Sequence, residues 1–491
     1  MKKFALISVL FGVFNTLLPL SGQDGFGFGF SETESDPSSD SASSAGANPS
    51  VKISGEAAAQ LLGYIDDFSS GSKIKETSLG DVFRGKLNFA ASAFNADAVI
   101  NLKLAPVFDG SASPVVINEA YLQAYFGSLS ITGGLRKLTW GKADSLGPLD
   151  VVNPLDYRDL TDMTNLMDRK LARPMIHASY RIGSFTKLEG VFIPWFEGHR
   201  FADAGRWAPS QIAAYPILIE NAVSAGLQAV PNISPGTLHP DLTNPDKIAA
   251  IQQHYGSLNL ASLYPATAKL EYAQAGLRFT STIGSSDFGV QYFFGNFFRP
   301  AVTINGIDTF FQNPYGITPN ILYNRYHQIG VDYAQVIAGF NLRAELAAHI
   351  TSDLSGGDGS VYNPSIAWSL GFDRDIIWGI NLNIQAVESV RLLYDKIGTD
   401  IAYDAEADAK ATATRLTGII SKKFLRDELE LKVTGLWGVE DGDFFILPAL
   451  IWTKGDLSIE GSAGFLGGKT QGELGQYHKN SFIKFRIGYR F

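Results

Sequence analysis

The sequence predicts an all-β protein: a closed antiparallel transmembrane β-barrel of about 18 strands, with about 16 as the alternative. Three observations lead to this fold class. Segments of about ten residues alternate apolar and polar side chains, long and short connections alternate between them, and the chain ends on the strictly alternating FIKFRIGYRF. Because successive side chains of a strand point to opposite faces, such segments would place an apolar face against lipid and a polar face inside a barrel.

The alternation continues from residue 51 to the last residue. In AVINLKLA, Ile100, Leu102 and Leu104 lie on one face and Asn101 and Lys103 on the other. A charged side chain that faces lipid at mid-bilayer costs about 2–4 kcal/mol. The alternate positions that carry polar side chains, which we call the polar parity, are therefore expected to face the interior. In the last ten residues the apolar parity holds Phe485, Ile487, Tyr489 and Phe491, and the polar parity holds Lys484, Arg486 and Arg490.

The connections between the segments are alternately short and long. Short turns include 127–128 and 284–287, and long connections include 140–173 and 195–267. This asymmetry is typical of outer-membrane barrels, which have short periplasmic turns and long external loops. A soluble β-sandwich would also alternate, but a sheet with this many strands would leave exposed edges unless it closed.

The N-terminal region predicts export. Residues 1–22 contain two lysines and a long apolar run, as in a signal peptide, and 23–50 form a flexible acidic linker rich in Ser and Gly. The barrel is expected over 51–491, in the outer membrane of a diderm bacterium after cleavage of the signal peptide. The expected partners are outer-membrane lipid, the barrel-assembly machinery, periplasmic chaperones and a small solute, and homo-oligomerisation stays open. A net charge of −9 without a basic run argues against nucleic acid.

Two stretches carry a resemblance. The last strand resembles the C-terminal assembly signal of bacterial outer-membrane barrels, with Tyr489 and Phe491 in the positions of its aromatic residues. The stretch 135–159 resembles a motif in a family of poorly characterised porin-like barrels, although GGLRKL replaces the Gly-Arg-Gln of that family. This second resemblance implies transport and names no solute. Its matching residues are Trp140, Gly141, Asp150, Val151, Asn153, Pro154 and Asp156.

The polar parity predicts a basic interior. Basic residues outnumber acidic ones about two to one on this parity, and rings of Lys and Arg bias a pore towards anions. Alternatively, these charges pair across the strands, as Arg343 beside Glu345 and Lys432 beside Glu430 suggest. The predicted pore-lining and constriction residues are Arg84, Lys86, Lys103, Glu119, Arg136, Asp150, Asp156, Arg158, Asp159, Arg343, Lys484, Arg486 and Arg490.

Two long loops could control the passage of solutes through the interior. The loop 140–173 is expected to form a short helix that Asn153 caps and Pro154 begins, and to fold inward or to pack over the rim. The loop 195–267 contains two segments with helical apolar patterns. It could cap the pore, bind a ligand or bind a surface.

The sequence therefore predicts a porin-like channel for passive diffusion of small solutes. Two alternatives stay open: a facilitator of hydrophobic solutes gated by loop 195–267, and a surface adhesin or structural barrel without transport. His177 and Ser179 resemble the His-x-Ser pair of outer-membrane phospholipases, but an orienting partner is not evident, so no enzyme is expected. No cofactor or metal is expected, because the seven histidines are scattered and Asp353 and Asp358 lack a full calcium-loop ligand set.

Overall fold

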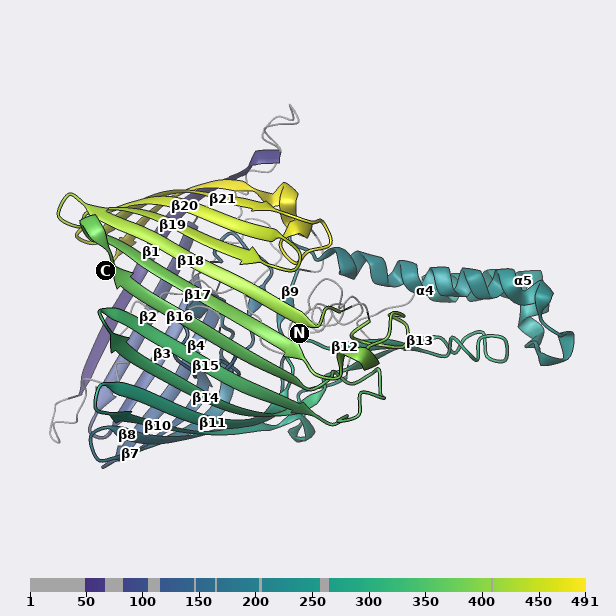
Figure 1. Cartoon of the computed structure of the whole chain (residues 1–491), viewed down its shortest axis with the longest axis horizontal. Helices are drawn as coiled ribbons and strands as arrows, with labels where there is room; N and C mark the ends of the chain where they lie inside the picture. Colours follow the sequence, from purple (N-terminus) through teal and green to yellow (C-terminus); the bar gives the residue numbers. More distant parts are fainter. Residues whose placement is uncertain are drawn as a thin grey trace.

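The computed structural model describes residues 49–66, 83–104, 115–144, 147–163, 166–202, 205–256, 265–407 and 409–491. It contains one 18-stranded antiparallel sheet that closes on itself, because the first strand, β1 (Ser50–Tyr64), pairs with the last, β22 (Phe482–Arg490) (Figure 1). The predicted closed barrel is confirmed, with 18 strands and not 16. The predicted signal peptide and most of the predicted linker lie outside the described residues.

Each strand of the barrel pairs with its neighbours in chain order, and two small two-stranded sheets lie outside the ring, one antiparallel and the other a parallel pair of β6 (Asp156–Tyr157) and β9 (Arg200–Phe201). The strands between the first and the last are β2 (Phe83–Ala93), β3 (Ala96–Leu104), β4 (Val115–Phe126), β5 (Leu129–Arg136), β7 (Arg173–Ile182), β8 (Thr186–Ile193), β10 (Gln274–Ile283), β11 (Ser286–Asn296), β14 (Arg325–Ile337), β15 (Phe340–Thr351), β16 (Ser365–Asp375), β17 (Ile380–Arg391), β18 (Thr412–Phe424), β19 (Leu429–Gly438), β20 (Asp443–Lys454) and β21 (Leu457–Gly467).

The two faces of the barrel wall differ as the alternation predicts. On β14, Ile329 and Val331 are 52% and 43% exposed on the outer face, whereas Gln328 and Asp332 are buried inside. On β22, Ile483, Phe485, Ile487 and Tyr489 are exposed, and Lys484 is buried. An outer surface of exposed aliphatic and aromatic side chains suits hydrocarbon, which has no partners for polar groups.

The last residue closes the seam between β1 and β22. The backbone N–H and C=O of Phe491 pair with those of Gly55 at 3.0 and 2.8 Å. A Cβ at Gly55 would lie 2.7 Å from the ring of Phe491, so glycine leaves the space that this ring occupies. Whether Tyr489 and Phe491 act as an assembly signal stays a prediction.

The two ends of the barrel differ in their connections. At one end the turns are short, as at 127–128, 284–285 and 338–339, and β1 begins and β22 ends there. The other end carries the long loops, with the short turn 439–442 as an exception to the predicted alternation. Among the described residues, no helix has the length and apolar content needed to cross a membrane.

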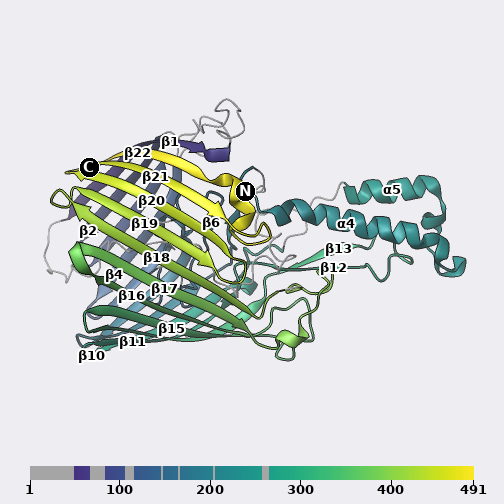
Figure 2. The same cartoon turned by 45° about the horizontal axis from the view of Figure 1, so that its top comes forward.

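A separate module projects from the long-loop end. The helices α4 (Ser210–Ala229) and α5 (Pro245–Gly256) extend away from the barrel beside the hairpin β12 (Ala301–Asn305) and β13 (Thr318–Leu322) (Figures 1 and 2). The two helices overlap the two predicted helical segments of loop 195–267, and α4 continues beyond the first segment to Ala229. An apolar core holds the module together, formed by Ile219, Val223, Leu242, Ile251, Tyr255, Val302, Ile304, Phe310, Ile317, Ile321 and Ala402.

Candidate functional site

The loop between β5 and β7 lies against inward-facing side chains of the barrel. On β15, the carboxylate of Glu345 accepts hydrogen bonds from the backbone N–H groups of Lys142, Ala143 (2.7 Å) and Leu149 (3.3 Å). Gly141 has a φ of 96°, and a Cβ there would lie 2.3 Å from the Glu345 carboxylate. Glycine is therefore required at this position, both for the backbone conformation and for the close approach of the carboxylate.

The other part of the loop is held by ion pairs to β2 and β22. The Asp162 carboxylate lies 2.5 Å from Arg84 on β2 and 2.5 Å from Lys484 on β22. The Asp168 carboxylate lies 2.7 Å from Lys86, also on β2. The loop therefore has two attachment regions, one on β15 and one on β2 and β22.

These two attachment regions lie on opposite walls. Following the pairings around the ring, β2 is the second strand and β15 the eleventh, so nine steps of the 18-strand ring separate them in either direction. A segment that binds both strands must cross the interior. We call residues 137–172 the crossing loop.

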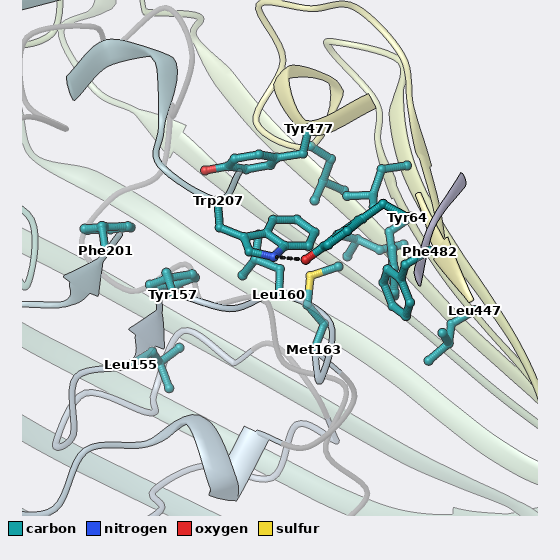
Figure 3. Packing of buried hydrophobic residues seen from close by; sticks show 14 of the residues in the cluster. Tyr64, Leu155, Tyr157, Leu160, Met163, Phe201, Trp207, Leu447, Tyr477 and Phe482 are labelled. Carbon is teal, nitrogen blue, oxygen red and sulfur yellow. Dashed lines mark hydrogen bonds between the residues drawn. The ribbon is translucent and has the colours of Figure 1, made fainter. Parts of the chain in front are cut away.

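Apolar packing fixes the flanks of the crossing loop. On one side, Leu155, Tyr157, Leu160 and Met163 belong to a buried cluster (Figure 3). The strands β17 to β22 contribute Val387, Ile419, Leu436, Phe445, Leu447, Leu466 and Phe482 to it. On the other side, Leu138, Trp140, Val151 and Val152 pack with residues of β7, β8, β11 and β14. Much of the wall next to the loop is thus covered by apolar contacts.

The inner face of β2 and β3 is different, because it carries lysines that are only half-buried. The side chains of Lys86 and Lys103 are 37% and 31% exposed, whereas that of Lys484 is 5% exposed. Lys103 donates to the backbone carbonyl of Asp168, and Lys137 donates to that of Met167 at 2.7 Å. Three ammonium groups therefore meet one end of the crossing loop, two of them partly exposed and that of Lys137 buried.

The charges at this end shift the pKa values of the loop residues. Burial opposes ionisation of Asp168, but the neighbouring Lys86 and Lys103 outweigh it and hold the pKa of this carboxyl below its usual range. Burial, reinforced by the charge of Lys103, lowers the pKa of Lys137 from 10.5 to about 7. Asp168 is therefore ionised at neutral pH, and Lys137 is close to its midpoint.

The structure brings several predicted site residues together at the crossing loop. Arg84, Lys86, Lys103 and Lys484 bind its acidic side chains, and Arg343 binds Asp144 as well as Asp373 on β16. Glu119 accepts from the backbone N–H of Lys137 at 2.8 Å. Contacts with the loop thus join seven of the thirteen predicted residues, the seventh being Asp159, which accepts from Arg84 at 3.4 Å.

The other predicted residues have separate partners. Asp150 pairs with Lys170 at 2.6 Å within the loop, and Asp156 pairs with Arg158 at 2.5 Å. Arg486 and Arg490 both approach Glu56 on β1. Arg136 donates to Thr132 at 2.9 Å, and its guanidinium lies over the ring of Tyr121. Arg136 lies opposite Arg173 because β5 pairs with β7.

Two details of the sequence interpretation are wrong. The helix expected to begin at Asn153 is absent, and the described part of this segment has only one helical turn, α3 (Leu166–Arg169). The Asn153 amide is used elsewhere: its Oδ1 accepts from the N–H of Leu138, and its Nδ2 donates to the carbonyls of Arg136 and Leu171. Glu345 does not pair with Arg343, because loop backbone N–H groups surround its carboxylate.

Five residues that were not among the predicted site residues hold the crossing loop: Asp144, Asp162, Asp168, Lys137 and Glu345. Their charge and their position in the loop or on the inward parity were visible in the sequence. Their partners were not, because these lie on strands far along the chain.

His177 and Ser179 face the interior, not lipid. His177 is buried, and its Nε2 lies 3.3 Å from Glu189 while its Nδ1 lies 3.3 Å from Arg136. This arrangement differs from the lipid-facing pair of the phospholipase alternative. Within the described part of the chain, no group of three or more His, Cys, Asp or Glu side chains is placed to hold a metal ion.

The chain is thus an 18-stranded barrel with a lipid-type outer surface and a loop across its interior. No family model and no curated protein matches its sequence. Among solved structures it is similar to the outer membrane protein opdK from Pseudomonas aeruginosa, with 8% identity, a TM-score of 0.46, and coverage of 90% of this chain and 99% of that chain. It is also similar to OccK8 (OprE) from the same organism (10% identity, TM-score 0.45, coverage 90% and 97%) and to Wzi from Escherichia coli (10%, 0.42, 89% and 84%).

Proposed function

We propose that the protein is an integral outer-membrane channel that lets small solutes diffuse passively past the crossing loop. The observation that supports this proposal is the loop itself, which binds β2 and β15 on opposite walls. A loop held in this position would narrow the interior. A barrel closed only for structural reasons needs no segment held by ion pairs and hydrogen bonds across its middle. A channel needs such a segment to set the width of its passage.

The proposed route runs along the inner face of β2, β3 and β4. Apolar packing covers the wall on β17 to β22 and on β7 to β14, whereas Lys86 and Lys103 remain partly exposed beside Asp168. Lys137 adds a third ammonium group there when it is protonated. We therefore propose a moderate preference for anions, set by these lysines and not by a basic interior as a whole.

Conductance across a planar lipid bilayer tests this proposal. The purified full chain should form a steady pore, and Lys86→Met should shift the reversal potential towards cation permeation by about two- to fivefold in permeability ratio. Lys187→Met on β8 is the matched control, because Lys187 is an inward lysine that pairs with Glu189 on its own strand at 3.1 Å. Absence of conductance in the wild type would contradict the channel, and equal reversal potentials would contradict the proposed route.

A surface-binding role is the second candidate, and the projecting module favours it. The helices α4 and α5 extend away from the barrel and have their own apolar core with β12 and β13 (Figure 2). This core gives the module a fixed shape at the end of the barrel that carries the long loops. Removal of the helices should abolish binding to a surface partner and leave conductance in place if the two roles are separate.

A further inference from the structure

Three cations lie on the outer face of the barrel at its short-turn end. They are Arg374 on β16, Lys422 on β18 and Lys454 on β20, each at or near the end of its strand. Each lies on the same face as an exposed apolar residue of its own strand, which is Leu370, Ile420 or Leu450. Since β16, β18 and β20 are alternate strands of one arc (Figure 2), neighbouring cations are about 10 Å apart across the strands. We call these three residues the cationic arc.

The cationic arc occupies only one part of the rim. At the same end of the barrel, the outward side chains of β2, β4, β7 and β10 are Ala93, Phe126, Ile182 and Ile283. In the described part of the chain, none of the three cations forms an ion pair. A lipid-facing charge is costly at mid-bilayer and is tolerated near the interface, so these positions place the cations at the depth of lipid headgroups.

Aromatic rings accompany the cations. The guanidinium of Arg374 lies 4.4 Å from the ring centroid of Phe340, and the Nζ of Lys422 lies 5.0 Å from that of Phe424. Trp378, in the turn between β16 and β17, is 78% exposed and has a φ of 61°, which is uncommon for a bulky residue. Tryptophan prefers the membrane interface, and backbone strain at an exposed position points to a functional use of the side chain.

Apolar side chains fill the strands between the cations. Lys422 lies opposite Ile380 on β17 and Leu431 on β19, and Arg374 lies opposite Leu382 on β17. Each of these two cations therefore stands at the rim beside outward apolar side chains. This arrangement matches a lipid molecule, whose charged headgroup lies at the interface and whose acyl chains extend towards mid-bilayer.

We infer that the cationic arc binds the headgroups of anionic phospholipids in preference to those without net charge. Arg374, Lys422 and Lys454 would donate charge-assisted hydrogen bonds to phosphate oxygens. Each Lys or Arg near an anionic lipid surface contributes about fivefold in affinity. Short turns of outer-membrane barrels face the periplasm, so the lipid would come from the inner leaflet. The inference rests on the membrane location of the proposed channel and does not require conduction.

Native mass spectrometry of the detergent-solubilised full chain tests the site. Dioleoyl phosphatidylglycerol, which is anionic, and dioleoyl phosphatidylcholine, which has no net charge, are titrated separately. The wild type should bind the first phosphatidylglycerol about tenfold more tightly than the first phosphatidylcholine. Lys422→Gln should reduce this preference by about fivefold, and Arg374→Gln combined with Lys422→Gln should remove it.

Lys423→Gln is the matched control, because Lys423 is the next residue of β18, is exposed, and lies on the opposite, inward parity. It should keep the wild-type preference, as should Lys422→Arg, which keeps the charge. Equal affinities of the two lipids for the wild type would overturn the inference, and so would an equal loss of preference in Lys423→Gln and Lys422→Gln.

Competition with salts identifies the source of the phosphate group. Sodium phosphate and sodium chloride at equal ionic strength should displace phosphatidylglycerol to the same small extent. A much stronger displacement by sodium phosphate would assign the cations to free phosphate and overturn the lipid site. Failure of the channel proposal would appear in the bilayer conductance experiment and would leave these lipid affinities unaffected.

Discussion

The Nζ of Lys484 on the last strand lies 2.5 Å from the carboxylate of Asp162, which lies more than 300 residues earlier in the chain. This ion pair fixes the crossing loop to the seam where the barrel closes. Arg84 on β2 shares the same carboxylate at 2.5 Å. Three side chains from distant parts of the sequence thus meet at one point of the inner wall.

Removal of this carboxylate should loosen the loop. We expect Asp162→Asn to lower the free energy of unfolding by about 2–4 kcal/mol, because Lys484 would stay buried without its ionic partner. Urea unfolding followed by tryptophan fluorescence measures this change. Asp395→Asn, which alters an exposed acid that pairs only with exposed Lys396, should change stability by less than about 0.5 kcal/mol. A similar, small effect of both variants would contradict the anchoring role of Asp162.

A glycine on β14 makes room for the crossing loop. A Cβ at Gly330 would lie 2.2 Å from the side chain of Leu149, so Gly330→Ala should destabilise the protein by about 1–3 kcal/mol through overpacking. Gly133→Ala on β5 is the matched control, since a Cβ there has no atom within 4 Å. The midpoint of thermal unfolding distinguishes the two variants. Equal midpoints would show that Leu149 moves away without cost.

Ion selectivity should depend on pH through Lys137. Its pKa of about 7 means that its charge appears as pH falls from 8 to 6, so preference for anions should rise over this interval. The pKa of Lys137 in the folded protein lies below the ordinary lysine value of 10.5, so folding favours the neutral amine. Its contribution to the free energy of unfolding is therefore complete above pH 10.5 and is lost as pH falls through about 7. Reversal potentials measured at pH 6, 7 and 8 (about one unit on either side of the midpoint) check the prediction. Lys137→Met should remove most of the pH dependence of selectivity. If this dependence persisted in the variant, another group would be its cause.

The projecting module should unfold independently of the barrel. The hydroxyl of Tyr255 donates to the carbonyl of Pro314 at 2.9 Å and accepts from the N–H of Ile317 at 3.1 Å. Tyr255→Phe leaves both backbone groups unpaired and should destabilise the module by about 1–3 kcal/mol. Limited proteolysis should then cut α4 or α5 faster, while the barrel keeps its thermal midpoint. Tyr394→Phe, at an exposed tyrosine, should leave the cleavage rate unchanged.

The barrel was predictable because its rule is local. Alternation with a period of two residues assigns each strand residue to lipid or to the interior, as Lys484 and Phe485 show on β22. Closure and strand number follow from the length and spacing of such segments. Each strand-length segment of the wall therefore contains the information that places its side chains.

The arrangement of the interior was not predictable in the same way. Counting charges on the inward parity suggested a basic interior, and it did not reveal that acids of the crossing loop form ion pairs with Arg84, Lys86 and Arg343. Asn153 has the sequence of a helix cap, yet its amide satisfies three backbone groups that only the folded barrel brings together. Contacts of this kind depend on which wall a loop reaches, and no local pattern specifies that.

The attachment of one segment to Glu345 and to Arg84 also has a mechanical consequence. A ring of strands joined only to its neighbours can flatten into an ellipse when the surrounding bilayer compresses it sideways. A segment bonded to two opposite strands resists compression along the line that joins them. Lateral pressure on the barrel would then be transmitted to the ion pairs of Asp162, so membrane tension and the opening of the interior would be physically linked.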